Sequence, residues 1–298
     1  MTAASDGVAE FAGRAIALTN LDRILWPEAG FTKARLVEYY TRVAPLILPH
    51  IRGRGLTLAR YPGGVEGRGF AQTECRGRPE WMATQEVRLT NGTVRRHCVV
   101  EDRAGLAWVA NQSALELHTF LAPASRPDRP DAVVFDLDPA TENAARIMSQ
   151  VAVRLREMLA EEDLESFVKT SGARGLHVYV PTGGTAGFVR CKSFAREFAA
   201  RLAAQHPDRI TDSLSPRRRG DRLLVDWTRM SERATIVAPY SPRALQRPSV
   251  SVPLRWDELD ERRPAGLWFE PDDVIERIES VGDPFAPIAS MRQTLPPE

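Results

Sequence analysis

The chain has 298 residues, of which 43% are hydrophobic and 27% are charged, and its formal net charge is only +1. This composition suits one large globular domain or two joined modules, and it excludes a disordered or fibrous chain. The longest apolar stretches are too short to span a membrane, and the N-terminus lacks the pattern of a signal peptide. We therefore expect a cytoplasmic protein with no membrane partner.

The cysteines and arginines limit the kinds of site that are possible. Cys75, Cys98 and Cys191 are widely spaced, with no CxxC pair and no paired histidines. From this spacing neither a disulfide framework nor a zinc site is expected. Arginines cluster within 52–60, 76–78 and 217–222, and their effect depends on where the fold places them.

The first part of the chain reads as a tail followed by an α/β module. Residues 1–20 are interpreted as a loose N-terminal tail, and the module is expected to span 21–131. Thr32 is the predicted N-cap of a helix that runs to about residue 48 and bends at Pro45. The remaining expected elements are a strand at 56–62, a hairpin turning at Asn91-Gly92, a helix at 103–112 and a strand at 114–119.

The second part, over 132–298, follows a regular order. The predicted elements are strands at 132–138, 166–170, 175–181 and 222–227, with helices at 141–160 and 190–205. This β-α-β-β-α-β order is the ferredoxin-like unit that RNA-recognition domains also use, so the fold class is α/β (α+β) with an RRM-like C-terminal module. Beyond about residue 240 we expect a tail with one helix at 271–280.

Three aspartates are expected to converge on one face of this second module. Asp136 and Asp138 alternate with Phe135 and Leu137, and the two-residue period of a strand sends the two sets to opposite faces. Asp226 holds the matching position in the last strand. In the usual strand order of this unit, 4-1-3-2, the last strand lies beside the first, so the three carboxylates share one patch.

A patch of three carboxylates is expected to bind a cation. Close carboxylates repel one another unless they are neutralised, and their hard oxygen atoms suit Mg²⁺ or Mn²⁺. Two-metal sites of this kind catalyse in-line phosphoryl displacement. A lone DxD before a proline is more often a turn, but the third aspartate on the predicted neighbouring strand favours a metal site.

A nucleotide cradle is predicted beside the aspartates. The segment KTSGARG, residues 169–175, is a Gly-containing turn in which Ser171, Arg174 and backbone N–H groups could contact a triphosphate. His177 follows on the face that carries the aspartates. The arginine run at 217–222 leads into the strand of Asp226 and places positive charge at the rim, where phosphates would enter.

The segments FDLDP, KTSGARGLHVYVP, VDWTRM and TIVAPYSPRA resemble, in that order, the polymerase domain of bacterial ligase D, a member of the archaeo-eukaryotic primase superfamily. The resemblance runs from about residue 21 to about residue 259, and the combined motifs are highly specific. It implies a stand-alone primase-polymerase that adds NTP or dNTP to a primer 3′-hydroxyl at DNA gaps or breaks with a 5′-phosphate, in gap-filling repair or non-homologous end joining. It also implies a nucleoid-associated location, Mn²⁺ or Mg²⁺ in a two-metal site, and Ku and a separate DNA ligase as partners.

The resemblance assigns roles to individual residues. The implied metal ligands are Asp136, Asp138 and Asp226; the implied nucleotide contacts are Ser171, Arg174, His177, His118, Arg243 and Arg60; the implied DNA contacts are Arg23 and Lys33 at the 5′-phosphate and Phe70 on the template.

The chain also departs from the family pattern. Ala59 stands where relatives often have Lys, Thr73 and Glu74 replace basic residues, and Thr228-Arg229-Met230 replaces SQN. We hypothesise that Arg229 binds nucleotide by supplying the positive charge that is missing at Ala59. Two alternatives stay open: a catalytically weak DNA-end-binding protein, and a two-metal nuclease, which the predicted cradle disfavours.

Overall fold

The computed structural model describes residues 6–89, 91–261 and 267–297, and the chain divides into two compact units. The first unit comprises the chain up to Phe120 with Val237–Val250 and Phe269–Gly282, and the second comprises Leu121–Ile236, Ser251–Trp268 and the chain from Asp283 onward. This division differs from the contiguous one expected at 131/132. It differs because β16 (Pro242–Arg243), β17 (Ser249–Val250) and α8 (Pro271–Val281) pack against elements of the first unit.

The first unit is built around β5, which pairs with β6, β8 and β9, while β7 pairs with β8. The elements of this unit, besides those of its C-terminal segments, are β1 (Gly7–Phe11), β2 (Arg14–Leu18), β3 (Ile24–Trp26), η1 (Pro27–Ala29), β4 (Phe31–Thr32), α1 (Lys33–Arg42), α2 (Ala44–Ile51), β5 (Gly55–Arg60), β6 (Phe70–Gln72), β7 (Thr84–Arg88), β8 (Val94–Val99), α3 (Arg103–Asn111) and β9 (Ala114–Phe120). The chain passes back from the second unit to the first within β15 (Thr235–Val237).

The predicted helix after Thr32 is present as two helices. Thr32 is its N-cap, as predicted, because its Oγ1 accepts a hydrogen bond from the backbone N–H of Arg35 at 3.4 Å. α1 ends at Arg42, and α2 begins with Pro45 in its first turn. Proline has no N–H to continue the hydrogen-bond ladder, so the chain breaks the helix where a bend was predicted.

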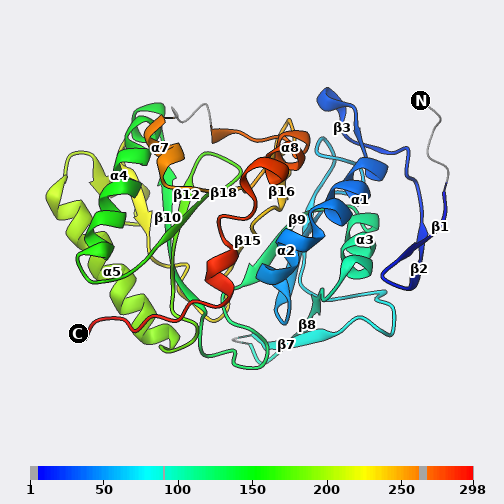
Figure 1. Ribbon diagram of the computed structural model, residues 1–298, viewed down its shortest axis with the longest axis horizontal. Helices are drawn as coiled ribbons and strands as arrows, with labels where there is room; N and C mark the ends of the chain where they lie inside the picture. Colours follow the sequence, from blue (N-terminus) through cyan, green and yellow to red (C-terminus); the bar gives the residue numbers. More distant parts are fainter. Residues whose placement is uncertain (1–5, 90, 262–266, 298) are drawn as a thin grey trace. The chain divides into compact units, whose positions relative to one another are not determined.

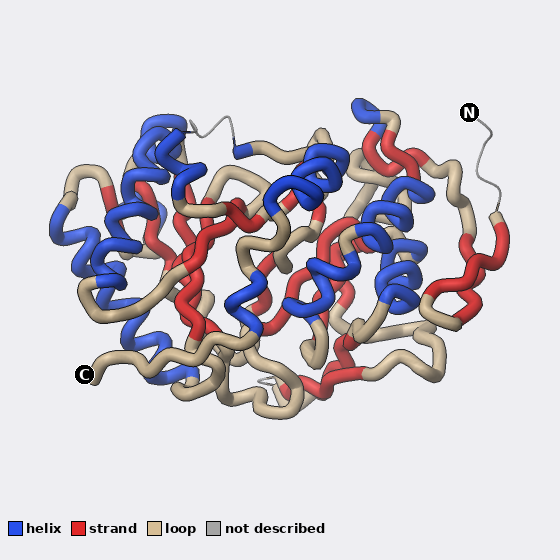
Figure 2. Tube along the Cα trace, viewed as in Figure 1, coloured by secondary structure: helices blue, strands red, loops and turns tan. Residues whose placement is uncertain are grey.

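The prediction of a loose N-terminal tail is wrong for residues 7–18. These residues form the antiparallel hairpin β1–β2, drawn as a red pair of strands in Figure 2. Ala12 and Gly13 have φ values of 49° and 74°, which a tight hairpin turn requires. Ile16 and Leu18 are buried, and the side chain of Asn111 donates to the carbonyl of Ala17 at 2.9 Å. The hairpin therefore gains its order from packing against α3, which the local composition does not show.

The predicted hairpin around Asn91-Gly92 is confirmed. β7 and β8 pair in register from Thr84 to Arg88, and the N–H of Leu89 donates to the carbonyl of Thr93 at 2.8 Å. Gly92 has a φ of 81°, a conformation that glycine adopts without strain.

The expectation of no disulfide is wrong for one pair of cysteines. Cys75 and Cys98 are joined by a disulfide, with Cα atoms 4.9 Å apart, while Cys191 is a buried free thiol. The segment of Cys75 runs beside β8, since its N–H donates to the carbonyl of Arg96 at 2.7 Å. This pairing joins residues 23 apart in sequence, so spacing alone does not reveal it.

The second unit contains the predicted β-α-β-β-α-β module. Its elements are β10 (Ala132–Pro139), α4 (Glu142–Ala160), β11 (Phe167–Thr170), β12 (Leu176–Pro181), α5 (Phe188–Gln205), β13 (Ile210–Thr211), α6 (Pro216–Arg219), β14 (Leu223–Asp226), β18 (Pro253–Leu254), α7 (Asp257–Glu261) and η3 (Ala286–Ala289). The sheet order is β13-β14-β10-β12-β11-β18. Its four central strands confirm the predicted order 4-1-3-2, with β13 and β18 added at the edges.

Helices α4 and α5 cover one face of this sheet (Figure 1). α4 buries residues at helical spacing, including Met148, Ala152 and Leu155. The ring of Phe135 on β10 lies 6.4 Å from that of Phe194 and 6.3 Å from that of Phe198 on α5. The predicted apolar face of β10 therefore packs against the helices, and its alternate residues belong to the other face.

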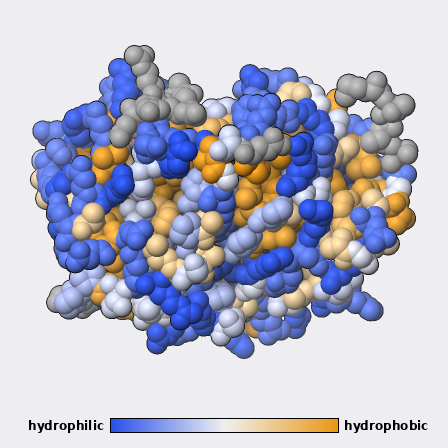
Figure 3. Space-filling model, in the orientation of Figure 1, coloured by the Kyte–Doolittle hydropathy of each residue, from blue (hydrophilic) through white to orange (hydrophobic). Residues whose placement is uncertain are grey.

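Hydrophilic residues make up most of the face drawn in Figure 3. In the part of the chain that the structure describes, none of the helices has the length and apolar character that crossing a membrane requires.

Candidate active site

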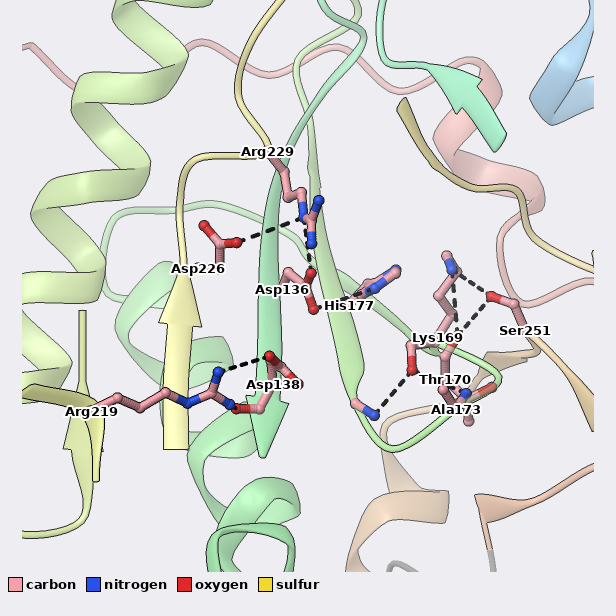
Figure 4. A network of polar contacts seen from close by, with 12 residues as sticks. Asp136, Asp138, Lys169, Thr170, Ala173, His177, Arg219, Asp226, Arg229 and Ser251 are labelled. Atoms are coloured by element: carbon pink, nitrogen blue, oxygen red, sulfur yellow. Dashed lines mark hydrogen bonds and ion pairs between the residues drawn. The ribbon is translucent and has the colours of Figure 1, made fainter. Parts of the chain in front are cut away.

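A row of polar side chains crosses four neighbouring strands of the second unit. Asp136 on β10 is paired in register with Asp226 on β14 and with His177 on β12. His177 is paired in turn with Lys169 on β11. Residues paired in register point to the same face of a sheet, so the row continues from carboxylates through an imidazole to an ammonium group. The predicted convergence of Asp136, Asp226 and His177 is thus present (Figure 4).

Asp136 lies at the centre of this row and is only 8% exposed. Its Oδ1 is 3.5 Å from Nε2 of His177, and its Oδ2 accepts a hydrogen bond from Nε of Arg229 at 3.1 Å. Burial alone would raise the pKa of Asp136, but His177 and then Arg229 outweigh it and hold the pKa at about 2. Asp136 is therefore ionised at neutral pH.

Asp226 is held beside Asp136 by its own loop. Its Oδ1 accepts hydrogen bonds from the N–H and the hydroxyl of Thr228, at 2.7 and 2.6 Å. Its Oδ2 lies 3.7 Å from Nε of Arg229, so one guanidinium group stands between two carboxylates (Figure 4).

Asp138 has a different partner. Arg219 donates from Nη1 to its Oδ2 at 3.1 Å and from Nη2 to its carbonyl oxygen at 2.6 Å. The side chain of Asp138 is 51% exposed. Arg219 belongs to the arginine run that the sequence placed at the rim of the site, and it reaches an aspartate directly.

The three aspartates have the chemistry of ligands for a divalent cation, but their arrangement suits one only in part. Arg229 shows that the place between Asp136 and Asp226 accommodates positive charge, and carboxylates are the ligands that Mg²⁺ and Mn²⁺ prefer. Within residues 6–89, 91–261 and 267–297, however, no three His, Cys, Asp or Glu side chains are arranged to hold a metal ion. Asp138, whose Oδ2 is held by Arg219, is not arranged with the other two carboxylates in this structure.

The predicted cradle is a tight turn organised by Ser171. Its Oγ accepts hydrogen bonds from the N–H groups of Ala173 and Gly175, at 3.2 and 3.0 Å. A Cβ on Gly175 would lie 2.5 Å from the carbonyl oxygen of Leu137, so only glycine allows the turn to approach β10. The backbone N–H groups of this turn were expected to face phosphate. Two of them, those of Ala173 and Gly175, instead donate within the turn and stabilise it.

Arg174 projects from this turn and is exposed. It lines a pocket of about 420 Å³ together with Thr141 and Glu142 at the start of α4 and with Trp268.

The other predicted contacts belong to the first unit, where His118 and Arg243 share a carboxylate. Nε2 of His118 on β9 is 2.7 Å from Oε2 of Glu116, and Nε of Arg243 on β16 is 3.1 Å from the same oxygen. The N–H of Ala244 donates to Oε1 of Glu116 at 2.8 Å. The structure therefore joins two predicted nucleotide contacts through a residue that the sequence motifs did not single out.

A second cluster in the first unit brings together Arg23, Lys33 and Arg60. Lys33 is only 4% exposed and donates from Nζ to the carbonyl of Thr19. Burial, followed by the positive charge of Arg23, lowers the pKa of Lys33 to about 8, and Arg60 acts in the same direction. These cations are close enough to repel one another, as at a site for an anion.

Arg60 and Phe70 are direct neighbours, paired in register between β5 and β6. The Arg60 guanidinium lies 5.5 Å from the centre of the Phe70 ring, and it donates to the carbonyl of Gln112 at 2.7 Å and to Oε1 of Gln72 at 2.7 Å. Phe70 is 48% exposed, which leaves ring surface available for stacking.

Three residues of these clusters are not predicted by the sequence motifs. Glu116 lies two residues before His118, and this spacing on one strand already indicates a shared face. Lys169 lies within the predicted cradle segment, but its complete burial and its contact with Ser251 depend on the distant segment at 251–254. Arg219 could not be distinguished within its arginine run.

Comparison with known proteins agrees with this geometry. Residues 32–285 match the family model described as LigD, primase-polymerase domain. The chain is 33% identical over 282 residues to the multifunctional non-homologous end joining protein LigD of Mycolicibacterium smegmatis, and 35% identical over 277 residues to the multifunctional non-homologous end joining DNA repair protein LigD of Mycobacterium tuberculosis. These matches cover 92% and 90% of this chain but only 36% of each relative, so the chain spans about a third of the length of these relatives.

A solved structure is also similar. The polymerase domain of Mycobacterium tuberculosis ligase D, in complex with DNA, superposes with a TM-score of 0.86 at 31% sequence identity, covering 93% of this chain and 99% of that domain. Family, relatives and fold all agree on a nucleotidyltransferase of the polymerase type. The chain belongs to the LigD primase-polymerase domain family.

Proposed function

We propose that this chain is a metal-dependent primase-polymerase that adds NTP or dNTP to a primer 3′-hydroxyl at gaps or breaks in DNA. The observation that carries the proposal is the pairing of Asp136 with Asp226 on one side and with His177 on the other. A carboxylate pair beside an imidazole on one face of a sheet suits the transfer of a charged phosphoryl group.

Asp136, Asp138 and Asp226 are the proposed ligands of Mn²⁺ or Mg²⁺. When bound, such ions neutralise the charge that develops in phosphoryl displacement. Ser171, Arg174 and His177 are the proposed contacts with the phosphates of the incoming nucleotide, and Ser171 also keeps the 169–175 turn in shape. Arg229 stands between two of the proposed ligands and is the cation that a metal would displace.

The first unit supplies the proposed contacts with nucleotide and DNA. His118, Arg243 and Arg60 contact the nucleotide, Arg23 and Lys33 bind a 5′-phosphate, and Phe70 stacks on the template. The clustering of cations supports these roles, because phosphate contacts dominate the affinity for nucleic acid. Because the relatives are named as non-homologous end joining proteins, we propose the same pathway for this chain, with Ku and a separate DNA ligase as partners.

Primer extension tests the proposal. The protein is incubated with Mn²⁺, with each nucleotide pool in turn, and with a labelled primer on gapped DNA that carries a downstream 5′-phosphate. The matched control is the Asp136→Ala, Asp138→Ala double variant. We expect extension with the wild type and none with the variant.

Two other outcomes favour the alternatives. Shortened primers would indicate a nuclease. Tight binding to the gap without extension in either protein would indicate an end-binding protein, a function that the ion pairs of Arg219 and Arg229 with the aspartates specifically favour.

A further inference from the structure

Glu116 is a buried carboxylate in the first unit that has no role in the function proposed above. It lies in the middle of β9 and is 8% exposed. Its register partner on β5 is Ala59, whose methyl group carries no charge. The contacts of Glu116 come instead from His118, Arg243 and Ala244.

These contacts keep Glu116 ionised. Burial alone would raise its pKa, but the hydrogen bond from His118, the charge of Arg243 and the N–H of Ala244 outweigh burial and lower the pKa to about 2. An ionised carboxylate only accepts hydrogen bonds, so Nε2 of His118 must carry a proton to donate at 2.7 Å. The carboxylate thus sets both the tautomer and the orientation of the imidazole ring.

The same carboxylate aligns Arg243. This residue lies on β16, far from His118 in the sequence, and both contact Oε2 of Glu116. The side chains of His118 and Arg243 remain 24% and 20% exposed, so each keeps surface for a ligand. Oε1 of Glu116 is anchored to the backbone at Ala244, which ties the carboxylate to the segment that carries Arg243.

We propose that Glu116 is the positioning residue that holds His118 and Arg243 side by side to grip the phosphates of the incoming nucleotide. This inference rests on the proposed function of those two residues. Glu116 repels phosphate, yet the contacts it orders outweigh that repulsion, because preorganised donors bind without the cost of being aligned.

The test uses three variants to separate the reach of the Glu116 side chain from its charge. Glu116→Ala removes both the reach and the charge. Glu116→Asp keeps the charge but is too short to hold both partners, and Glu116→Gln keeps the length and an acceptor oxygen but removes the charge. The measurements are KM and kcat for the nucleotide in primer extension, and the equilibrium affinity for a fluorescent nucleotide.

We expect Glu116→Ala and Glu116→Asp to raise KM about tenfold, as for removal of a charged hydrogen bond, with a smaller change in kcat. Glu116→Gln keeps only one acceptor oxygen, so it can serve either the two side chains at Oε2 or the N–H of Ala244 at Oε1, and it should raise KM by less than Glu116→Ala does. A KM that falls or stays unchanged in Glu116→Asp would overturn the inference, and this variant decides the question if Glu116→Ala does not fold.

A spectroscopic readout adds a measurement that a merely structural role would not move. The chain has five histidines, so the ring nitrogens of His118 can be followed by ¹H–¹⁵N correlation and assigned with a His118→Gln variant. We expect protonation at Nε2 to be fixed in the wild type and no longer fixed in Glu116→Ala. An unchanged His118 signal in Glu116→Ala would overturn the inference.

Two controls distinguish this inference from the function on which it rests. Asp102→Ala removes another carboxylate of the first unit, the N-cap of α3 and partner of Arg14, and should lower stability without changing KM. Arg243→Ala tests the nucleotide contact itself. If Arg243→Ala binds nucleotide normally, both the proposed contact and the role of Glu116 fail. If Arg243→Ala weakens binding and Glu116→Ala does not, only the inference about Glu116 fails.

Discussion

The candidate clusters of the two units have opposite charge balance. In the second unit three aspartates are paired with two arginines, Arg219 and Arg229, and the carboxylates are in excess. In the first unit one carboxylate, Glu116, is shared by His118 and Arg243, while in the cluster of Arg23, Lys33 and Arg60 the cations outnumber the one nearby carboxylate, Asp6. Excess carboxylate attracts metal ions and excess cation attracts phosphate, so we assign the proposed metal ions to the aspartates and the proposed 5′-phosphate to the cluster of Arg23, Lys33 and Arg60.

The largest expected effect comes from removing a carboxylate of the second unit. Asp226→Asn keeps the shape of the side chain and an acceptor for Thr228, but it removes one charge beside Asp136. We expect primer extension to fall about a hundredfold or more, with weaker Mn²⁺ binding measured by electron paramagnetic resonance. Full activity and unchanged Mn²⁺ affinity would show that Asp226 does not bind metal, which would contradict the proposed difference between the two clusters.

The next effect concerns the aromatic ring beside the cations of the first unit. Phe70→Ala should weaken the affinity for gapped DNA about tenfold, because stacking on one base contributes roughly 1–3 kcal/mol. Fluorescence anisotropy with labelled DNA measures the change. Val8→Ala is the matched control, since Val8 is also exposed, at 73%. Equal affinities of the two variants would show that Phe70 does not contact DNA.

A smaller effect should follow the titration of Lys33. Its pKa of about 8 in the folded protein lies below its ordinary value of 10.5, so the ammonium loses its charge as the pH rises through about 8. We expect the preference for a 5′-phosphate over a 5′-hydroxyl to fall several-fold over that range, as roughly 1 kcal/mol of charge interaction disappears.

Unfolding does not explain this loss of phosphate preference, because the contribution of Lys33 to stability changes with pH in the opposite direction. Between about pH 8 and the unfolded pKa of about 10.4, the unfolded chain binds more protons at Lys33, so its contribution to stability rises with pH. Lys33→Met keeps the apolar stem without the charge and should show a weak preference that does not change with pH. A wild-type profile identical to that of Lys33→Met would show that Lys33 does not bind the phosphate.

The smallest effect is expected at Arg229, whose side chain is 46% exposed. Arg229→Ala should lower the Tm of the metal-free protein by no more than about 3 °C, since a partly exposed ion pair contributes about 1 kcal/mol or less. Added Mn²⁺ should reduce this difference, because it would neutralise the same carboxylates. The exposed Arg233→Ala is the control.

The same variant tests the hypothesis that Arg229 binds nucleotide in place of a basic residue at position 59, where this chain has Ala59. Unchanged nucleotide affinity in Arg229→Ala would contradict it, whatever the result for Tm.

The sheet that carries the aspartates is predictable from the sequence alone. The two-residue period of FDLDP and VDW, with the β-α-β-β-α-β order, predicts the strand order and the shared face of Asp136, Asp226 and His177, and the structure confirms both. This prediction succeeds because register and face are local properties of strands, and the order of a common unit has few alternatives.

Which charges meet depends on the tertiary structure. The pairing of Arg229 with Asp136, of Arg219 with Asp138 and of Arg243 with Glu116 joins residues that are far apart in sequence. The hairpin β1–β2 escapes prediction because it packs against the distant α3, and the Cys75–Cys98 disulfide escapes it because its cysteines are 23 residues apart. The periodicity of a strand indicates which face a residue occupies. The partner of that residue depends on how distant segments of the chain pack together, and no local sequence pattern contains that information.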